Sequence, residues 1–177
     1  VDSGAPGLEL LPCLSEKQNI TVISHNLSVL SLASQFPNLN VIALGGIYNS
    51  ETSSFSGKSA LEELSKMSID LVFLKADGVT IERGLTSSSY SEIEVKRNVA
   101  QWNRDIILLV DGAEFGRNAL ITFCEIGRLH AIISDAPAPN EFRYANALRR
   151  ITFLSAQAED HTIARLSELS LPKWQTV

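Results

Sequence analysis

The sequence predicts an α/β fold in which helices cover both faces of a mostly parallel sheet. Short apolar runs, too short to form helices, alternate along the chain with segments of helical periodicity. Several of these runs end in Asp, in Gly or in Ser-Asp, residues that favour turns and loops. This alternation is typical of parallel strands that are joined through helices by right-handed connections. The 177 residues suit a single domain with a sizeable core.

The N-terminal part is expected to alternate between helices and strands. Asn26 is a good helix N-cap, and the apolar residues from Val29 to Phe36 fall on one face of the helix behind it. Glu62 and Lys66 are spaced as a favourable ion pair on a later helix. The predicted elements are the end of a strand at 1–4, a helix at 8–14, a strand at 20–23, the helix after Asn26, a strand at 39–44, a polar loop at 47–55 and a helix capped by Ser56.

The strand at 71–74 is the centre of the predicted sheet. Its apolar residues lie between Asp70 and Lys75, a pattern typical of a strand that is buried on both faces. Turns are expected at 75–78 and at 83–86. The remaining predicted elements are a helix at 90–102 capped by Ser89 and Glu92, strands at 105–110, 130–133 and 151–154, and helices at 141–149 and 160–169, whereas 120–126 fits either type.

The composition argues against some functions for these residues. The formal net charge of −5 disfavours contact with nucleic acid, because phosphate contacts need clustered Lys and Arg. No apolar run reaches membrane-spanning length and no signal peptide is recognisable, so we expect a cytoplasmic protein. Cys13 and Cys124 are then expected to be reduced thiols. Because residues 1–4 resemble the end of a strand, we expect the chain to be truncated at its N-terminus.

Motifs for common catalytic or metal sites are missing or incomplete. Residues 56–59 resemble the end of a phosphate-binding P-loop, but Thr52 stands where the motif needs its first glycine. No GxSxG sequence supplies a serine nucleophile. His25, His130 and His161 lie in unrelated segments without the spacing of metal ligands. We therefore expect neither a metal nor a cofactor.

Acidic residues follow three of the predicted strands. Asp77, Asp111 and Asp135 should meet at the carboxyl edge of a parallel sheet, where α/β proteins bind ligands. They either cap loops and helices or together form a polar site, suited to the hydroxyl groups of a sugar. Glu94 and the cations at 96–97 lie early on the next helix, where they form either a solvated face or the rim of that site.

These residues are part of an ordered set of short motifs that spans nearly the whole chain. The set resembles the C-terminal sensor domain of the DeoR family of sugar-responsive bacterial transcriptional regulators, over residues 1 to about 154. Its members are Gly45-Gly46, Phe55-Ser56-Gly57, Asp70 to Gly78, Gly84-Leu85-Thr86, Glu94 to Arg97, Asp111 to Gly116 and Ser134-Asp135.

The resemblance implies a fold shared with ribose-5-phosphate isomerase and one effector-binding domain over residues 1–177. It implies a sugar or sugar-phosphate effector, a homo-oligomer, and DNA binding only through an N-terminal helix-turn-helix domain that this chain lacks. The residues it places at the ligand site are Asp2, Ser3, Gly4, Ser24, His25, Asn26, Gly45, Gly46, Gly57, Lys75, Asp77, Gly78, Gly84, Thr86, Glu94, Arg97, Asp111 and Glu114.

The chain departs from the family pattern at the ligand site. Ala5 and Pro6 replace hydroxyl residues that would donate to a phosphate, and Pro6 lacks even a backbone N–H. Glu114 stands where the family has a lysine, and Lys75 stands where it has a small residue. We therefore expect the effector to be an altered sugar phosphate, an unphosphorylated sugar or another polyol, in that order of preference.

A catalytic sugar-phosphate isomerase on the same fold is the main alternative. Isomerisation needs a carboxylate base, for which Glu94 or Asp77 could serve, and a cation that stabilises the enediolate. The lysine that such isomerases carry in a glycine-rich turn has no counterpart beside Gly84, so we expect no enzyme activity. A third possibility is a domain that has lost its pocket and only oligomerises.

Overall fold

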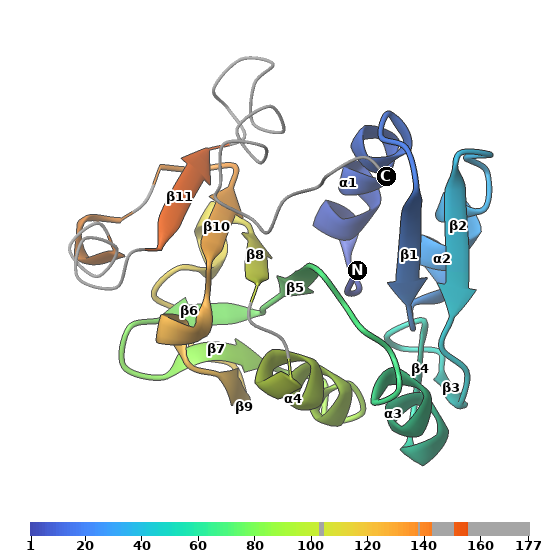
Figure 1. Cartoon of the computed structure of the whole chain (residues 1–177). Coiled ribbons are helices and arrows are strands. Elements are labelled where there is room, and N and C mark those ends of the chain that lie inside the picture. The colour runs from blue at the N-terminus through green and yellow to red at the C-terminus, as the bar shows by residue number, and fades with distance from the viewer. Residues whose placement is uncertain (103–104, 138, 143–150, 156–177) are drawn as a thin grey trace.

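The computed structural model describes residues 1–102, 105–137, 139–142 and 151–155 (Figure 1). Its largest sheet has four parallel strands in the order β11-β10-β8-β5, and β1 pairs in parallel with β2 in a separate sheet. The strands are β1 (Ile20–Ser24), β2 (Leu39–Ala43), β5 (Val72–Lys75), β8 (Ile106–Val110), β10 (Ala131–Ser134) and β11 (Thr152–Ser155). The predicted α/β class and parallel sheet are confirmed.

Residues 1 and 2 lie between these two parallel sheets. The Val1 amino group donates a hydrogen bond of 2.8 Å to the carbonyl of Ile23 on β1. The Asp2 N–H donates one of 3.0 Å to the carbonyl of Phe73 on β5. Residues 1 and 2 therefore lie at the centre of the described structure, between two strand edges.

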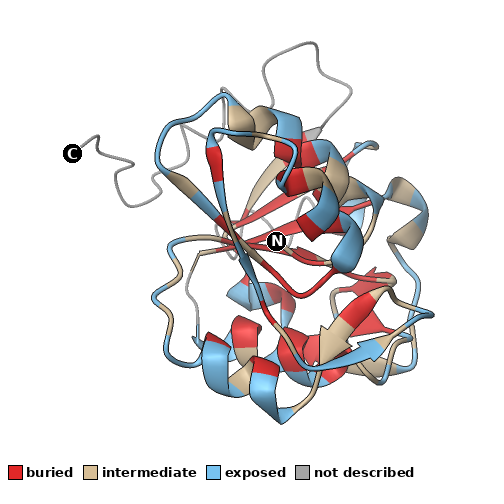
Figure 2. Ribbon diagram, turned by 90° about the vertical axis from the view of Figure 1, so that its right-hand side faces the viewer, coloured by how far each residue is buried: buried red, intermediate tan, exposed pale blue. Residues whose placement is uncertain are grey.

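Helices cover both faces of the parallel strands, as the sequence predicts. Along β5, Val72 and Leu74 belong to the cluster that includes Leu64 of α3, whereas Phe73 packs with Leu10 of α1 on the other face. Red, buried positions follow the central strands and the inner sides of the helices in Figure 2. The helices are α1 (Ala5–Ser15), α2 (Leu27–Ala33), α3 (Lys58–Leu64) and α4 (Ile93–Trp102).

Antiparallel strands at the lower edge of the view in Figure 1 complete the described fold. One sheet has the order β6-β7-β9, and β3 pairs with β4 as a hairpin. These elements are β3 (Ile47–Asn49), β4 (Ser54–Ser56), β6 (Gly78–Thr80), β7 (Gly84–Ser87) and β9 (Ile121–Cys124), with short 3-10 turns η1 (Gly112–Glu114) and η2 (Ile126–Arg128).

Several local predictions are wrong. The expected loop at 47–55 is the β3–β4 hairpin, and the expected turn at 83–86 is strand β7. These strands have only three or four residues each, which is too short for a period of two to be recognised. The residue that caps α3 is Gly57, not Ser56, and α4 begins at Ile93, not at 90. The helices predicted at 141–149 and 160–169 lie largely or wholly outside the described residues.

Side-chain details follow the predictions only in part. Glu62 pairs at 3.4 Å with Lys58, which lies one turn before it, and not with the predicted partner Lys66, which lies one turn after it. Cys13 is partly buried, and Cys124 is buried, and both are free thiols. Among the described residues, no helix combines the length and apolar character that crossing a membrane requires.

Replacing Asn26 with Ala is expected to destabilise the domain by about 1 kcal/mol, the usual contribution of a helix N-cap. The Asn26 side chain accepts a 3.1 Å hydrogen bond from the Val29 N–H and donates to the carbonyls of Thr52 and Ser53. Urea unfolding measures the change. Asn26→Asp keeps the capping acceptor but loses the donors, so it should fall between parent and Ala. Equal stability of Ala and parent would contradict the capping role.

Candidate functional site

A polar pocket of about 700 Å³ lies where several strands end, and we call it the strand-end pocket. Ser3 and Gly4 contribute from the start of α1, and Lys75 and Asp77 from the end of β5. Asn49, Glu51 and Thr52 contribute from the β3–β4 turn, Ser88 to Glu92 from the loop before α4, and Lys96 from α4 itself. Hydroxyl, amide, carboxylate and ammonium groups thus surround one cavity at the carboxyl edge of the sheet.

Asp2 and Lys96 form a buried ion pair beneath the pocket. The Lys96 Nζ lies 2.8 Å from Asp2 Oδ2 and 3.0 Å from the Lys75 carbonyl, and the Asp2 carboxylate also accepts from the backbone N–H groups of Ser3 and Lys75. Burial by itself would raise the pKa of Asp2, but the charges of Lys96 and His25 and these hydrogen bonds lower it to about 2. Burial would lower the pKa of Lys96, but Asp2 and Glu92 raise it.

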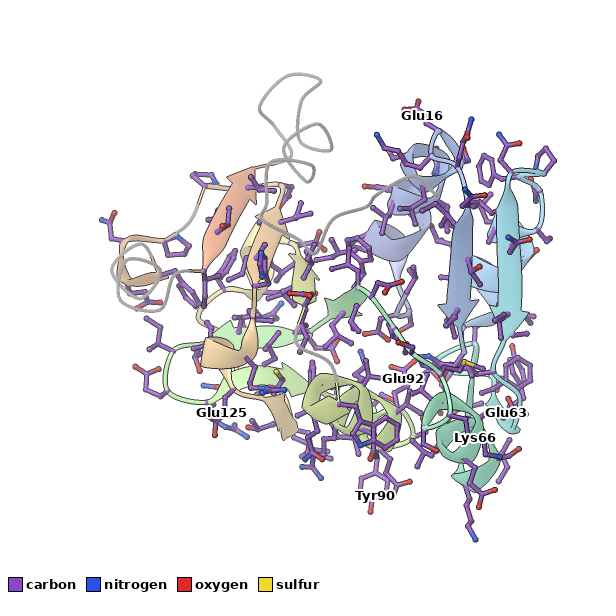
Figure 3. The ribbon with its side chains drawn as sticks, in the orientation of Figure 1. Glu16, Glu63, Lys66, Tyr90, Glu92 and Glu125 are labelled. Carbon is purple, nitrogen blue, oxygen red and sulfur yellow. The ribbon has the colours of Figure 1, made fainter. Side chains whose placement is uncertain are left out.

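Glu92 adds a second carboxylate to this cluster. Its Oε2 lies 3.8 Å from Lys96 Nζ, and its Oε1 lies 3.7 Å from His25 Nε2, which is longer than a hydrogen bond. These two facing atoms have no hydrogen-bond partner among the described residues. Burial would raise the pKa of Glu92, but His25 and Lys96 hold it below its usual value. Figure 3 shows Glu92 inside the molecule and Tyr90 pointing away from it.

Lys75 connects the pocket to a second pair of carboxylates. Its Nζ lies 3.3 Å from Asp77 Oδ1 and 3.7 Å from Glu114 Oε1. Burial would raise the pKa of Asp77, but the Ser88 N–H and Lys75 lower it. The pKa of Glu114 is raised by burial, in spite of a hydrogen bond from the Asp111 N–H. Lys75 therefore balances the carboxylate of Glu114, which would otherwise repel an anionic ligand.

The chemistry of this pocket suits the recognition of a polyhydroxylated molecule. Carboxylates such as Asp77 and Glu51 accept hydrogen bonds from hydroxyl groups, and serine hydroxyls at 88, 89 and 91 donate or accept them. Lys75 supplies a partly exposed ammonium group at the same wall. No group of three or more potential metal ligands gathers within the described residues.

Comparison with known proteins adds an independent observation. The family model of the DeoR C-terminal sensor domain matches residues 1–136 of this chain. The chain is also 33% identical over 147 residues to the HTH-type transcriptional regulator IolR of Bacillus subtilis, with 82% of this chain covered. The chain belongs to the DeoR family.

Other DeoR-family relatives are transcriptional repressors by name. The chain is 27% identical over 139 residues to the glycerol-3-phosphate regulon repressor of Escherichia coli, with 78% of this chain covered. It is 25% identical over 137 residues to the transcriptional repressor AccR of Agrobacterium fabrum, with 77% covered. The chain spans 59%, 55% and 53% of the lengths of these three relatives.

This DeoR-family structure brings part of the predicted ligand set together. Ser3, Gly4, Lys75 and Asp77 line the strand-end pocket. Asp2 lies buried beneath the pocket, where its carboxylate accepts hydrogen bonds from Ser3, Lys75 and Lys96. The residues at the end of β1 have different roles: Ser24 donates to the Val1 carbonyl, His25 faces Glu92, and Asn26 caps α2.

Other predicted ligand residues lie elsewhere in the structure. Glu94 is exposed on α4, and Arg97 donates to the Thr122 carbonyl on β9. Asp111 caps η1, and neither Asp111 nor Asp135 lines the pocket. The three aspartates that follow predicted strands therefore do not meet there. Gly45 and Gly46 join β2 to β3, Gly57 caps α3, and Gly78, Gly84 and Thr86 belong to the β6–β7 hairpin.

The backbone geometry of that hairpin requires a glycine at position 84. Gly84 has a φ of +72°, and a Cβ there would collide with the Cys124 carbonyl oxygen. Its place in the sequence motif therefore reflects backbone geometry.

Sequence reasoning missed several residues of the strand-end pocket. The sequence predicts only a polar loop for Asn49, Glu51 and Thr52, and only a helix cap for Glu92, whereas all four line the pocket. A usable signal was present: Glu92 and Lys96 have the i, i+4 spacing that places both on one face of α4. The serines at 87–89 and 91 form a second signal, because such a run supplies many hydroxyl groups.

Proposed function

We propose that this DeoR-family sensor domain binds a sugar phosphate or a related polyol in the strand-end pocket, and that binding regulates transcription. The observation that carries this proposal is the set of hydroxyl, carboxylate and ammonium groups around one cavity at the carboxyl edge of the sheet. Lys75, flanked by Asp77 and Glu114, provides the ammonium group for an anionic substituent. A relative named for the glycerol-3-phosphate regulon is consistent with this class of ligand.

In the full-length protein, an N-terminal domain outside these residues binds DNA, and the effector shifts the equilibrium between two conformations. Such a shift is only as large as the difference in affinity of the effector for the two states.

We further propose that the protein is cytoplasmic and that it forms a homo-oligomer. Light scattering on the purified protein tests the oligomeric state. We expect binding without turnover, so ribose 5-phosphate isomerase activity would contradict this assignment.

A thermal shift screen tests the ligand class. The panel contains glycerol 3-phosphate, ribose 5-phosphate, glucose 6-phosphate, the three unphosphorylated parents and inorganic phosphate. A saturable rise in melting temperature is expected with at least one polyhydroxylated compound, because a ligand that prefers the native state stabilises it. Stabilisation by inorganic phosphate alone, or by nothing in the panel, would contradict the proposal.

Replacing Asp77 with Ala is expected to weaken the binding of any compound identified in that screen by roughly tenfold or more, the scale of one hydrogen bond to a charged group. Asp77 lines the pocket and accepts a 2.7 Å hydrogen bond from the Ser88 N–H. Calorimetric titration measures the affinity. Glu63→Ala is the matched control, because Glu63 lies on the outer side of α3 (Figure 3). Unchanged affinity in Asp77→Ala would remove Asp77 from the site.

A further inference from the structure

The strand-end pocket is surrounded by more carboxylates than ammonium groups. Three carboxylates and two ammonium groups line it, those of Glu51, Asp77, Glu92, Lys75 and Lys96. Two further carboxylates pair with these lysines from outside the lining: Asp2 lies 2.8 Å from Lys96 Nζ, and Glu114 lies 3.7 Å from Lys75 Nζ. These five carboxylates and two ammonium groups together carry a formal charge of −3.

Carboxylates already engage both lysines. Lys96 is 3% exposed, and its Nζ lies 3.8 Å from Glu92 Oε2 in addition to its contact with Asp2. Lys75 is more accessible, with 27% of its side chain exposed, but its Nζ lies 3.3 Å from Asp77 Oδ1 and 3.7 Å from Glu114 Oε1. An anionic substituent that approaches Lys75 therefore comes close to two carboxylates as well.

The N-terminus of α1 adds only a small positive charge to the pocket. Ser3 and Gly4 line the pocket at the start of this helix, and a helix N-terminus carries about half a positive charge. Within the first turn, Pro6 has no N–H, and the Gly7 N–H donates to the Gly4 carbonyl. The helix therefore offers few N–H groups to an anion.

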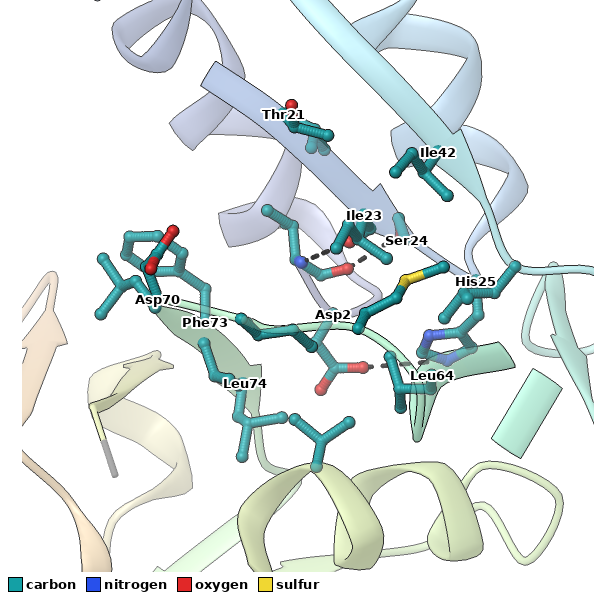
Figure 4. Close-up of a pocket in the computed structure, with 18 of the residues that line it drawn as sticks. Asp2, Thr21, Ile23, Ser24, His25, Ile42, Leu64, Asp70, Phe73 and Leu74 are labelled. Carbon is teal, nitrogen blue, oxygen red and sulfur yellow. Dashed lines mark hydrogen bonds and ion pairs between the residues drawn. The ribbon is translucent and has the colours of Figure 1, made fainter. Parts of the chain in front are cut away.

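His25 and the Val1 amino group also lie near this cluster. His25 Nε2 lies 4.0 Å from Asp2 Oδ1 (Figure 4) and 3.7 Å from Glu92 Oε1, so a protonated His25 adds one positive charge. Burial lowers the pKa of the Val1 amino group to about 6, so this group is mainly uncharged at neutral pH. Even with a protonated His25 and the α1 N-terminus, the surroundings of the pocket stay negative.

Uncharged polar groups complete the lining. Asn49 and Thr52 contribute from one wall, and serines 88, 89 and 91 contribute from the other. The walls meet where Asn49 Nδ2 donates a 3.1 Å hydrogen bond to Ser91 Oγ. Hydroxyl groups both donate and accept hydrogen bonds, and carboxylates accept them. A ligand that carries only hydroxyl groups can therefore bind this lining without bringing a charge into it.

The charges thus distinguish the two kinds of ligand named in the proposed function, on which this inference rests. We propose that the strand-end pocket selects an uncharged sugar or polyol and disfavours its phosphate ester. A phosphate monoester carries a charge of about −1.5 to −2 near pH 7, so the excess of carboxylates repels it. Hydroxyl groups instead donate to those carboxylates, and hydrogen bonds to charged groups are strong. The same acidic residues therefore exclude the ester and bind its parent.

Matched pairs of ligands test the proposal on the purified protein. Calorimetric titration compares glycerol, ribose and glucose with glycerol 3-phosphate, ribose 5-phosphate and glucose 6-phosphate. In any pair that binds, the uncharged member is expected to bind roughly tenfold or more tightly. An ester that binds as tightly as its parent would overturn this inference and leave the proposed function standing. Binding of none of these compounds would contradict the proposed function, and this inference with it.

The salt dependence of the affinity reports the sign of the charge that the ligand meets. Raising NaCl from about 0.05 M to about 0.5 M screens charges over shorter distances. A phosphate ester that is repelled by carboxylates should bind more tightly at the higher salt concentration, whereas the affinity of its parent should change less than roughly twofold. Weaker binding of the ester at high salt would show that it meets a positive site, against the proposal.

The variant Glu114→Gln tests one of the carboxylates beside Lys75. Glutamine keeps an oxygen that can accept the 3.1 Å hydrogen bond from the Asp111 N–H, but it removes a negative charge 3.7 Å from the Lys75 ammonium group. The affinity of the ester relative to its parent is expected to rise roughly fivefold or more. Glu63→Gln makes the same change on the exposed side of α3 and should leave this ratio unaltered. The same ratio in Glu114→Gln as in the parent protein would overturn the inference.

Discussion

Replacing Lys96 with Met should destabilise the domain by about 3–5 kcal/mol, the usual effect of removing one partner of a buried ion pair. The Lys96 side chain is 3% exposed, and its ammonium group lies 2.8 Å from Asp2 Oδ2. Met keeps the length and the apolar packing of the side chain but leaves the Asp2 and Glu92 carboxylates buried without their cation. Urea unfolding followed by circular dichroism measures the loss.

The controls separate the loss of charge from the loss of packing. Lys66→Met changes an exposed lysine on the outer side of the α3 region and should leave stability within about 0.5 kcal/mol (Figure 3). The double variant Asp2→Asn with Lys96→Met removes both members of the closest pair, so it should be more stable than Lys96→Met alone. A Lys96→Met protein as stable as the parent would show that the ion pair contributes nothing.

Acidification from pH 5 to pH 2 should remove roughly 2 kcal/mol of stability through Asp2 alone. The pKa of Asp2 is lowered from 3.8 to about 2 by Lys96, His25 and the hydrogen bonds it accepts, although burial acts in the opposite direction. A carboxyl whose native pKa lies below its unfolded value contributes stability that is complete above the unfolded pKa. That contribution decreases as the pH falls through 3.8 toward 2, because the unfolded chain binds the proton first.

Asp2→Asn isolates this contribution from that of other acids. Asp77 and Glu92 also have lowered pKa values, whereas the pKa of Glu114 is raised, so the parent protein reports a sum over several groups. The difference in free energy of unfolding between the parent and Asp2→Asn should be largest near pH 5 and should shrink by roughly 2 kcal/mol near pH 2. A difference that is independent of pH would mean that the native pKa of Asp2 is not lowered.

The core elements of the sheet could be predicted because their sequences carry their own signal. The run from Ile106 to Val110 is apolar at every position, as a strand buried on both faces requires. Asn26 indicates the start of α2, because its side chain caps the first turn of that helix. The hairpin of β3 and β4 has no such signal, because each strand has only three residues. These strands are held by pairing with each other and by a bridge between Asn26 and Ser54.

The ligand site was harder to predict, because residues that belong to the same set of sequence motifs do not all lie close together in space. Asp77, Asp111 and Glu94 all follow strand ends or begin a helix, yet only Asp77 lines the strand-end pocket. The β3–β4 turn reaches the same pocket from a distant part of the sequence, and it brings Asn49 and Glu51 there. A contact of this kind depends on how the hairpin packs, which the local pattern does not specify.

By itself, the sequence determined the α/β class, the positions of the main strands along the chain and membership of the DeoR family. Buried strands and short motifs can be recognised from the residues of each segment alone. Only the tertiary structure decided which charges meet. Asp2 and Lys96 are 94 positions apart, and their ion pair exists because α4 packs beneath the point where residues 1 and 2 lie between β1 and β5. Burial then gives that pair its strength, since a low local dielectric raises the energy of an uncompensated charge.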